Sequence, residues 1–132
     1  AYDLLRERGV ALASKKASRD TKEGVVEGYM HAGSKVGAII ELSCETDFVA
    51  RTPEFKELAH DLAMQICAMA PKHIDSYELS DEEVTDQQEI CLLDQAFIKD
   101  PSKTIRELIN DVVARVGENV VVRRFQRFAL GE

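Results

Sequence analysis

Two apolar segments follow one another between residues 24 and 44, the second with a period of two, and this pattern predicts two β-strands. In the second run, alternate positions share one apolar face: Val36, Ala38, Ile40, Leu42 and Cys44. An apolar run over residues 24–31 precedes it, and a short connection around Gly33 separates the two. Strands joined by so short a connection are typical of an antiparallel hairpin.

The spacing changes to a helical period after residue 52. Thr52 is suited to the N-cap position and Pro53 to the first helical position, where its missing N–H is no loss. Pro71 is expected to end this helix. Its apolar stripe is Phe55, Leu58, Ala59, Leu62, Ala63, Ile66 and Ala70.

A second helix is predicted between Thr104 and Gly117. Thr104 and Glu107 have the spacing of a capping box, and Gly117 is a natural C-terminal stop. Residues 118–131 are rich in Val and Phe, which favours a final strand.

The order of strands and helices predicts an α+β fold, in which a small antiparallel sheet packs against helices on one face. The length of 132 residues suits one folded core. We expect that core to span residues 21–132. Before it, residues 1–9 have the pattern of a helix tail that stops at Gly9, and residues 10–20 that of a basic linker.

The net charge of −7 is concentrated in one segment. Residues 75–98 contain eight acidic side chains and neither Lys nor Arg, which is typical of a solvated face or a mobile arm. Such a balance disfavours nucleic acid as the main partner. No apolar run approaches the ~18 residues of a membrane span, so no membrane partner is expected.

Candidate chemistry is sparse along the chain. The sequence has no glycine-rich phosphate loop, no HExxH or GxSxG motif, and no histidines at metal-ligand spacing. We therefore predict no catalytic residues, no metal and no cofactor. The odd number of cysteines, Cys44, Cys67 and Cys91, favours buried thiols in a reducing compartment over a disulfide framework.

Two minor alternatives remain open. His31 and Cys44 could form a thiol–imidazole pair if the hairpin brought them together. Arg123, Phe125 and Arg127 alternate on the last predicted strand and could stack on RNA bases. For each, a structural role is the simpler interpretation, because free Cys is commonly buried and a sheet needs apolar residues for its core.

The segment Thr46–Val49 raises a sharper question. Asp47 and Phe48 lie where a strand gives way to a helix, in the kind of connection that often carries function. Either Phe48 covers the start of the helix beside Phe55, or the pair is presented to a partner. The residues alone favour neither alternative.

Four blocks of the sequence resemble the elongation factor Ts family: residues 28–51, 55–66, 92–100 and 116–132. They are colinear, and the resemblance extends over nearly all 132 residues. The most specific are TDFVAR after the hairpin, residues 46–51, and the ending that contains Gly117, Glu118 and Asn119. The resemblance implies a small antiparallel sheet with helices on one face, as predicted above, with 21–132 as the family's core or dimerisation domain.

The resemblance also implies a function. Members of this family act on elongation factor Tu, in its GDP-bound and nucleotide-free forms, and promote guanine-nucleotide exchange without covalent chemistry. It implies that Thr46, Asp47, Phe48 and Val49 bind the partner and disturb its Mg²⁺ site. A cytoplasmic location in bacteria, or an organelle matrix, would follow. Shorter members of the family pair up, so a homodimer is expected. The alternative is a partner-binding or dimerisation module of the same fold without exchange activity.

Two departures from the family pattern matter. The family's N-terminal domain resembles a ubiquitin-associated domain, and only its tail is expected within residues 1–20. The family also carries a further helical stretch before its LLxQPF block. Here Ile90 runs directly into Cys91, and Ala96 stands where proline is common. We expect one of two explanations: this helical stretch is deleted from the protein, or the sequence skips residues that the protein has at this junction. The good match on both sides favours skipped residues.

Overall fold

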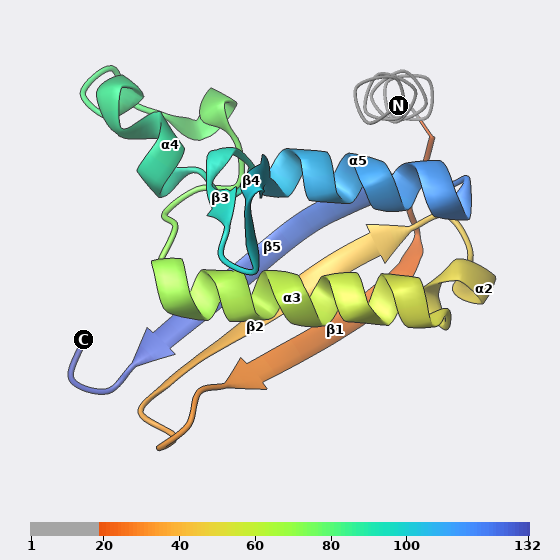
Figure 1. Cartoon of the computed structure of the whole chain (residues 1–132), viewed down its shortest axis with the longest axis horizontal. Helices are drawn as coiled ribbons and strands as arrows, with labels where there is room; N and C mark the ends of the chain where they lie inside the picture. Colours follow the sequence, from red (N-terminus) through yellow and green to blue (C-terminus); the bar gives the residue numbers. More distant parts are fainter. Residues whose placement is uncertain (1–18) are drawn as a thin grey trace.

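The computed structural model describes residues 19–132, which form an antiparallel sheet with helices on one face (Figure 1). Within this range the main sheet has three strands in the order β1-β2-β5. β1 (Glu23–Met30) and β2 (Val36–Cys44) form the predicted hairpin, and β5 (Val120–Ala129) pairs with the other edge of β2. The expected α+β class is therefore confirmed.

The central strand shows why its sequence alternates. Ala38, Ile40, Leu42 and Cys44 are each no more than 6% exposed, whereas Ile39 on the opposite face is 44% exposed. The buried side chains meet the helix α3 (Pro53–Met69), which lies along β1 and β2 (Figure 1). Burial of such aliphatic side chains is the main favourable term for a small domain.

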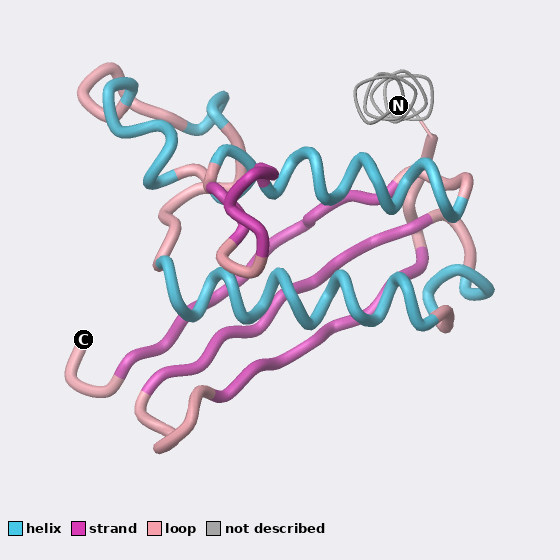
Figure 2. Tube along the Cα trace, viewed as in Figure 1, coloured by secondary structure: helices cyan, strands magenta, loops and turns pink. Residues whose placement is uncertain are grey.

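Both predicted long helices are confirmed, together with their caps. The Thr52 hydroxyl accepts a hydrogen bond from the N–H of Phe55, and Pro53 opens α3. α5 (Ile105–Val116) begins with the complete capping box of Thr104 and Glu107. It ends at Gly117, whose φ of 75° is left-handed and suits a residue without a Cβ. α3 and α5 lie side by side over the same face of the sheet (Figure 2).

The segment between α3 and α5 is more ordered than a solvated arm. It forms short turns η1 (Ser76–Glu78), η2 (Val84–Asp86) and η3 (Leu92–Asp94), the single-turn helix α4 (Gln87–Ile90), and a small hairpin of β3 (Ala96–Phe97) and β4 (Asp100–Thr104). Cys91 and Leu92 are 0% exposed and Gln95 is 2% exposed. The expectation of a uniformly solvated or mobile stretch is wrong for its second half, because these residues fill the core.

Backbone hydrogen bonds tie the chain on both sides of the Ile90–Cys91 junction into the fold. The N–H of Cys91 donates to the Gln87 carbonyl, and that of Leu92 donates to the His73 carbonyl. His73 and Cys91 also form an isolated parallel bridge. The short connection thus satisfies its backbone groups and returns the chain to the core.

Candidate partner-binding site

The segment 46–50 forms a one-turn helix, α2 (Asp47–Ala50), between β2 and α3. Its residues divide sharply by exposure. Val49 is 4% and Ala50 is 2% exposed, and both belong to the main core cluster. Phe48, between them and Asp47, is 76% exposed. The question left open by the sequence is therefore answered by the geometry: Phe48 points outward and does not cover the start of α3.

Thr46 fixes the start of this helix. Its backbone is extended, and its hydroxyl oxygen accepts a hydrogen bond from the N–H of Val49 over 3.3 Å. At the other end, the N–H of Thr52 donates to the carbonyl of Val49. A short turn is not stable alone, so these caps and the buried pair hold it in place.

A second chain segment reaches this turn from the end of α5. The Glu118 carboxylate accepts hydrogen bonds from the N–H groups of Glu45 and Thr46 at 3.2 and 3.0 Å. It also accepts from the Thr46 hydroxyl at 2.7 Å. In return, the Glu45 carboxylate accepts from the N–H of Asn119 at 2.6 Å. The Gly117–Asn119 motif could be found in the sequence, but its contact with Thr46 could not.

Asp47 is exposed beside Phe48. Its carboxylate lies 3.1 Å from the Arg51 guanidinium, one turn further along the chain. Both side chains are more than 60% exposed, so this ion pair contributes little to stability. The Asp47 carboxylate can therefore exchange Arg51 for another donor at small cost.

The thiol–imidazole alternative is excluded by the strand register. Cys44 pairs with Glu23 at one end of the hairpin, whereas His31 follows Met30, which pairs with Gly37 at the other. Burial, followed by the charge of Glu118, raises the pKa of Cys44 to about 11. The Cys44 thiol is therefore protonated at neutral pH and is a weak nucleophile.

The alternating arginines of β5 are used within the fold. Arg123 donates to the hydroxyl and the carbonyl of Thr21, and Arg127 donates to the carbonyl of Cys67. Phe125 is partly buried against the core. These contacts support the structural interpretation of this strand over an RNA-binding one.

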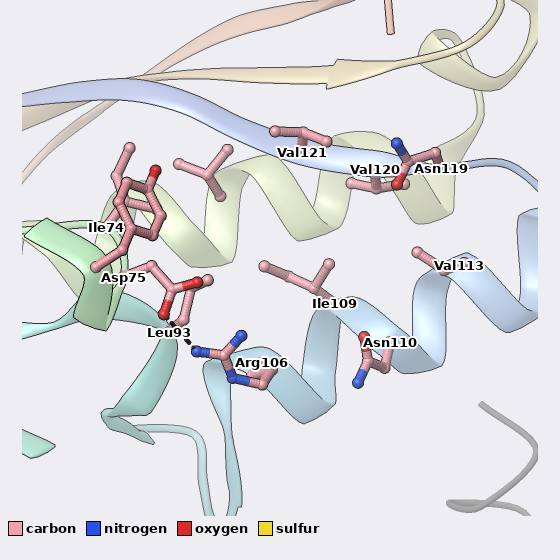
Figure 3. A pocket seen from close by; sticks show the side chains of 12 residues that line it. Ile74, Asp75, Leu93, Arg106, Ile109, Asn110, Val113, Asn119, Val120 and Val121 are labelled. Atoms are coloured by element: carbon pink, nitrogen blue, oxygen red, sulfur yellow. Dashed lines mark hydrogen bonds and ion pairs between the residues drawn. The ribbon is translucent and has the colours of Figure 1, made fainter. Parts of the chain in front are cut away.

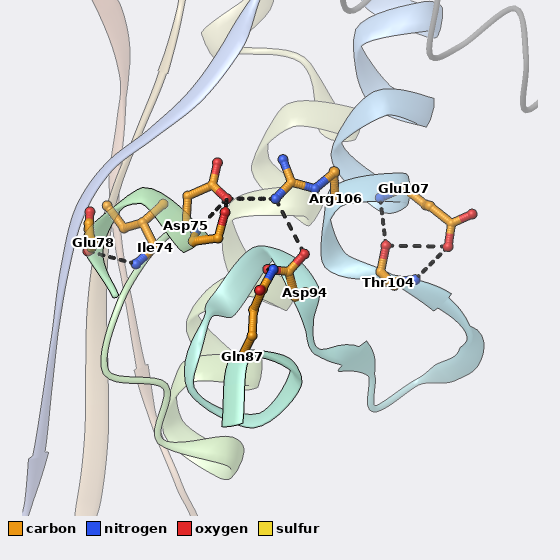
Figure 4. A network of polar contacts seen from close by, with 9 residues as sticks. Ile74, Asp75, Glu78, Gln87, Asp94, Thr104, Arg106 and Glu107 are labelled. Atoms are coloured by element: carbon orange, nitrogen blue, oxygen red, sulfur yellow. Dashed lines mark hydrogen bonds and ion pairs between the residues drawn. The ribbon is translucent and has the colours of Figure 1, made fainter. Parts of the chain in front are cut away.

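A groove runs between α5, β5 and the segment after α3 (Figure 3). Apolar side chains such as Ile109 and Val113 line it, and Arg106 and Asp75 close one end. Arg106 donates to Asp75 at 2.7 Å and to Asp94 at 3.4 Å, as part of a polar network at the start of α5 (Figure 4). This network fastens the acidic segment to the helix.

Residues 19–132 contain neither a candidate metal site nor a helix suited to span a membrane. No cluster of His, Cys, Asp and Glu in this range has an arrangement that could hold a metal ion. None of the helices in this range combines the length and apolar character that a membrane crossing requires.

Comparison with known proteins identifies the family. The family model described as "Elongation factor TS" matches residues 10–90 and 85–132. The elongation factor Ts of Caldanaerobacter subterraneus subsp. tengcongensis is 40% identical, over 100% of this chain and 81% of the relative. The elongation factor Ts of Thermodesulfovibrio yellowstonii is 43% identical, over 100% of this chain and 80% of the relative. The chain belongs to the elongation factor Ts family. Its relatives are translation elongation factors, and its own role lies in translation elongation.

The alignments also bear on the Ile90–Cys91 junction. The alignment with the Caldanaerobacter protein runs over 162 positions, 30 more than the 132 residues of this chain. The two matches to the elongation factor Ts family model overlap over residues 85–90. These observations agree with a stretch of the family that has no counterpart here and would fall at this junction.

Proposed function

We propose that this chain is a guanine-nucleotide exchange factor for elongation factor Tu and that Thr46, Asp47, Phe48 and Val49 form its contact with the nucleotide domain. The observation that carries this proposal is the 76% exposure of Phe48 on a turn whose neighbouring residues are buried. A large aromatic side chain held outward on an anchored base is suited to insertion into another protein.

The energetics of such a step are favourable. Full burial of a Phe side chain contributes about 1.5–3 kcal/mol, which is enough to shift a local element of the partner. Mg²⁺ requires near-ideal octahedral geometry and bridges nucleotide phosphates to the protein. A small displacement of the partner's Mg²⁺ ligands therefore weakens the ion and the nucleotide together. No covalent bond forms or breaks in this scheme.

Asp47 has a separate part in the proposed contact. Its exposed carboxylate lies next to Phe48 and is paired with the solvent-exposed side chain of Arg51. It can accept hydrogen bonds from the partner while Phe48 is buried, which would orient the insertion. Val49 contributes indirectly, because its buried side chain anchors the turn in the core.

Thermodynamic linkage provides the test. If the chain weakens GDP binding, GDP must weaken binding of the chain by the same factor. We would titrate the chain against elongation factor Tu by calorimetry at increasing GDP and fixed Mg²⁺. An exchange factor loses affinity as GDP rises. A partner-binding module without exchange activity, the second candidate function, binds equally well at every GDP concentration.

The exposed face of the sheet supports a second proposal, that residues 21–132 form a dimerisation domain. Val26, Met30 and Phe128 are each at least 65% exposed, and with Ile39 they form an apolar patch on the face opposite α3 and α5. Patches of this kind mark interaction sites, and a two-fold dimer would cover both copies. Light scattering should then give twice the mass of one chain for the wild type and the mass of a single chain for Phe128→Glu.

The proposed tail of a ubiquitin-associated-like domain in residues 1–20 lies almost wholly outside the described residues. Arg19 lies at the edge of the described part, where its carbonyl accepts a hydrogen bond from the Asn119 side chain. The segment just before the proposed core is thus fastened beside the contact segment.

A further inference from the structure

We propose that Glu118 is the positioning residue of the proposed contact: its carboxylate latches the backbone of Glu45 and Thr46 and so fixes the direction of Phe48. This inference rests on the proposed function, because it concerns how the same turn is presented. Glu118 itself needs no contact with the partner.

The argument begins where the sheet ends. The ladder between β2 and β5 stops at the pair Cys44 and Val120. Beyond it the two chains separate, so the N–H groups of Glu45 and Thr46 have no strand partner. The Glu118 carboxylate accepts a hydrogen bond from each of them, at 3.2 and 3.0 Å. A carboxylate forms stronger hydrogen bonds than a neutral carbonyl, so the Glu118 side chain replaces the strand partner that these two N–H groups lack.

The arrangement is reciprocal. Glu118 reaches from the β5 side to the backbone on the β2 side, and Glu45 reaches back to the N–H of Asn119 at 2.6 Å. The side chain of Asn119 then donates to the carbonyl of Arg19. Each carboxylate therefore closes a link between segments more than 70 residues apart in the sequence. Gly117 makes this possible, because its left-handed conformation turns the chain at the end of α5.

The third contact of Glu118 bears directly on the turn. The Thr46 hydroxyl has one proton and two lone pairs. The hydroxyl donates a hydrogen bond to Glu118 at 2.7 Å, which orients its oxygen to accept a hydrogen bond from the N–H of Val49 at 3.3 Å. Glu118 thus supports the N-cap of α2, and α2 carries Phe48. Because the turn is ordered before binding, less conformational entropy is lost when Phe48 is buried.

Amide hydrogen exchange followed by NMR tests the latch without any partner. In Glu118→Ala, the amides of Glu45, Thr46 and Val49 should exchange at least about tenfold faster, because the hydrogen bonds that protect them are lost or loosened. Glu118→Gln keeps an acceptor for the amides but cannot accept the Thr46 proton, so only Val49 should change appreciably. Unchanged exchange in Glu118→Ala would overturn the proposal.

The matched control is Asp100→Ala. Asp100 is also a carboxylate that accepts from a backbone N–H and a hydroxyl, both of Ser102, but it lies in the β3–β4 hairpin. It should leave the exchange of the three α2-region amides as in the wild type. A change of equal size in Asp100→Ala would attribute the effect of Glu118→Ala to general loosening and would overturn the latch.

A double-mutant cycle then asks whether Glu118 acts through Phe48. Glu118→Ala should slow chain-stimulated GDP release by about tenfold, but it should slow it no further in a Phe48→Ala background. Equal losses in both backgrounds would show that Glu118 acts elsewhere and would overturn its positioning role. If the wild-type chain fails to stimulate release at all, the proposed function fails, and the amide exchange still decides whether the latch exists.

Discussion

Phe48 and Val49 are consecutive residues of α2, yet Phe48 is 76% exposed and Val49 is 4% exposed. One turn of helix therefore contacts the core of this domain on one side and the solvent on the other. Val49 contributes to stability, and Phe48 is free to contribute to binding. This division separates two properties that substitutions can measure independently.

Phe48→Ala should leave the free energy of unfolding within about 0.5 kcal/mol of the wild type, because an exposed side chain loses little on truncation. Val49→Ala should lower it by about 1–3 kcal/mol, since buried methyl groups are removed and a cavity remains. Urea denaturation followed by circular dichroism measures both. A Phe48→Ala variant that is as unstable as Val49→Ala would contradict the outward placement of Phe48.

Thr104→Ala should lower the free energy of unfolding by about 1 kcal/mol, because it removes the capping box at the start of α5. The proposed contact lies near the opposite end of this 12-residue helix, a distance of about 18 Å along its axis. Stimulation of GDP release at 25 °C should therefore be unchanged. A selective loss of stimulation, with stability intact, would contradict this separation.

The Asp75–Arg106 pair should give the domain a dependence on acid. Burial by itself would raise the pKa of Asp75, but the hydrogen bonds from Arg106 and from the N–H of Ser76 outweigh it and lower the pKa below its ordinary value. A carboxylate with a depressed pKa adds stability above its unfolded value, near pH 4, and loses it as the pH falls through the folded value.

Asp75→Asn measures this contribution. The difference in free energy of unfolding between wild type and Asp75→Asn should be largest near pH 6 and should shrink below pH 4, as Asp75 in the wild type becomes protonated. Urea denaturation at pH 6, 4 and 3 provides the comparison. A difference that stays constant over this range would show that the pKa of Asp75 is not depressed by folding.

Iodoacetamide should not modify the folded chain at pH 7.5. Cys44, Cys67 and Cys91 are buried, and burial raises the pKa values of Cys44 and Cys91. Mass spectrometry should show no added group within minutes on the native chain and three groups after unfolding in urea. Rapid labelling of native Cys44 would revive the interpretation as a thiol enzyme.

The sequence predicted the long elements of the fold because each carries a repeated signal. β2 carries an apolar residue at every second position from Val36 to Cys44, and α3 has both a helical stripe and a Thr52–Pro53 start. The observed bounds of α3, Pro53–Met69, lie within one residue of the predicted ones. Such elements are specified locally, so tertiary contacts confirm them without changing them.

The segment between the helices was predicted poorly for the opposite reason. Its turns are three or four residues long, too short to show a period. Its acidic residues suggested solvent, but Leu92 and Gln95 are buried by contacts with distant elements. Gln65 of α3 donates to Gln95 and to the carbonyl of Ala96, and nothing in the local sequence signals that pairing.

The candidate site was predictable only in part. The motif of residues 46–49 could be found in the sequence, but the direction of Phe48 depends on which neighbour is buried. The latch from Glu118 joins residues 72 positions apart and needs the register of β2 and β5 to be known. A carboxylate after a helix-ending glycine would not have suggested it.

The central claim is that Phe48 drives nucleotide exchange. Its most direct test is the rate at which elongation factor Tu releases fluorescent GDP in stopped flow, with the chain, with Phe48→Ala, or with no addition. Tyr77→Ala is the matched control, since Tyr77 is an aromatic residue exposed by 79% far from α2 in the sequence. We predict faster release with the wild type and Tyr77→Ala, and most of that increase lost in Phe48→Ala. Equal stimulation by Phe48→Ala and the wild type would contradict the account.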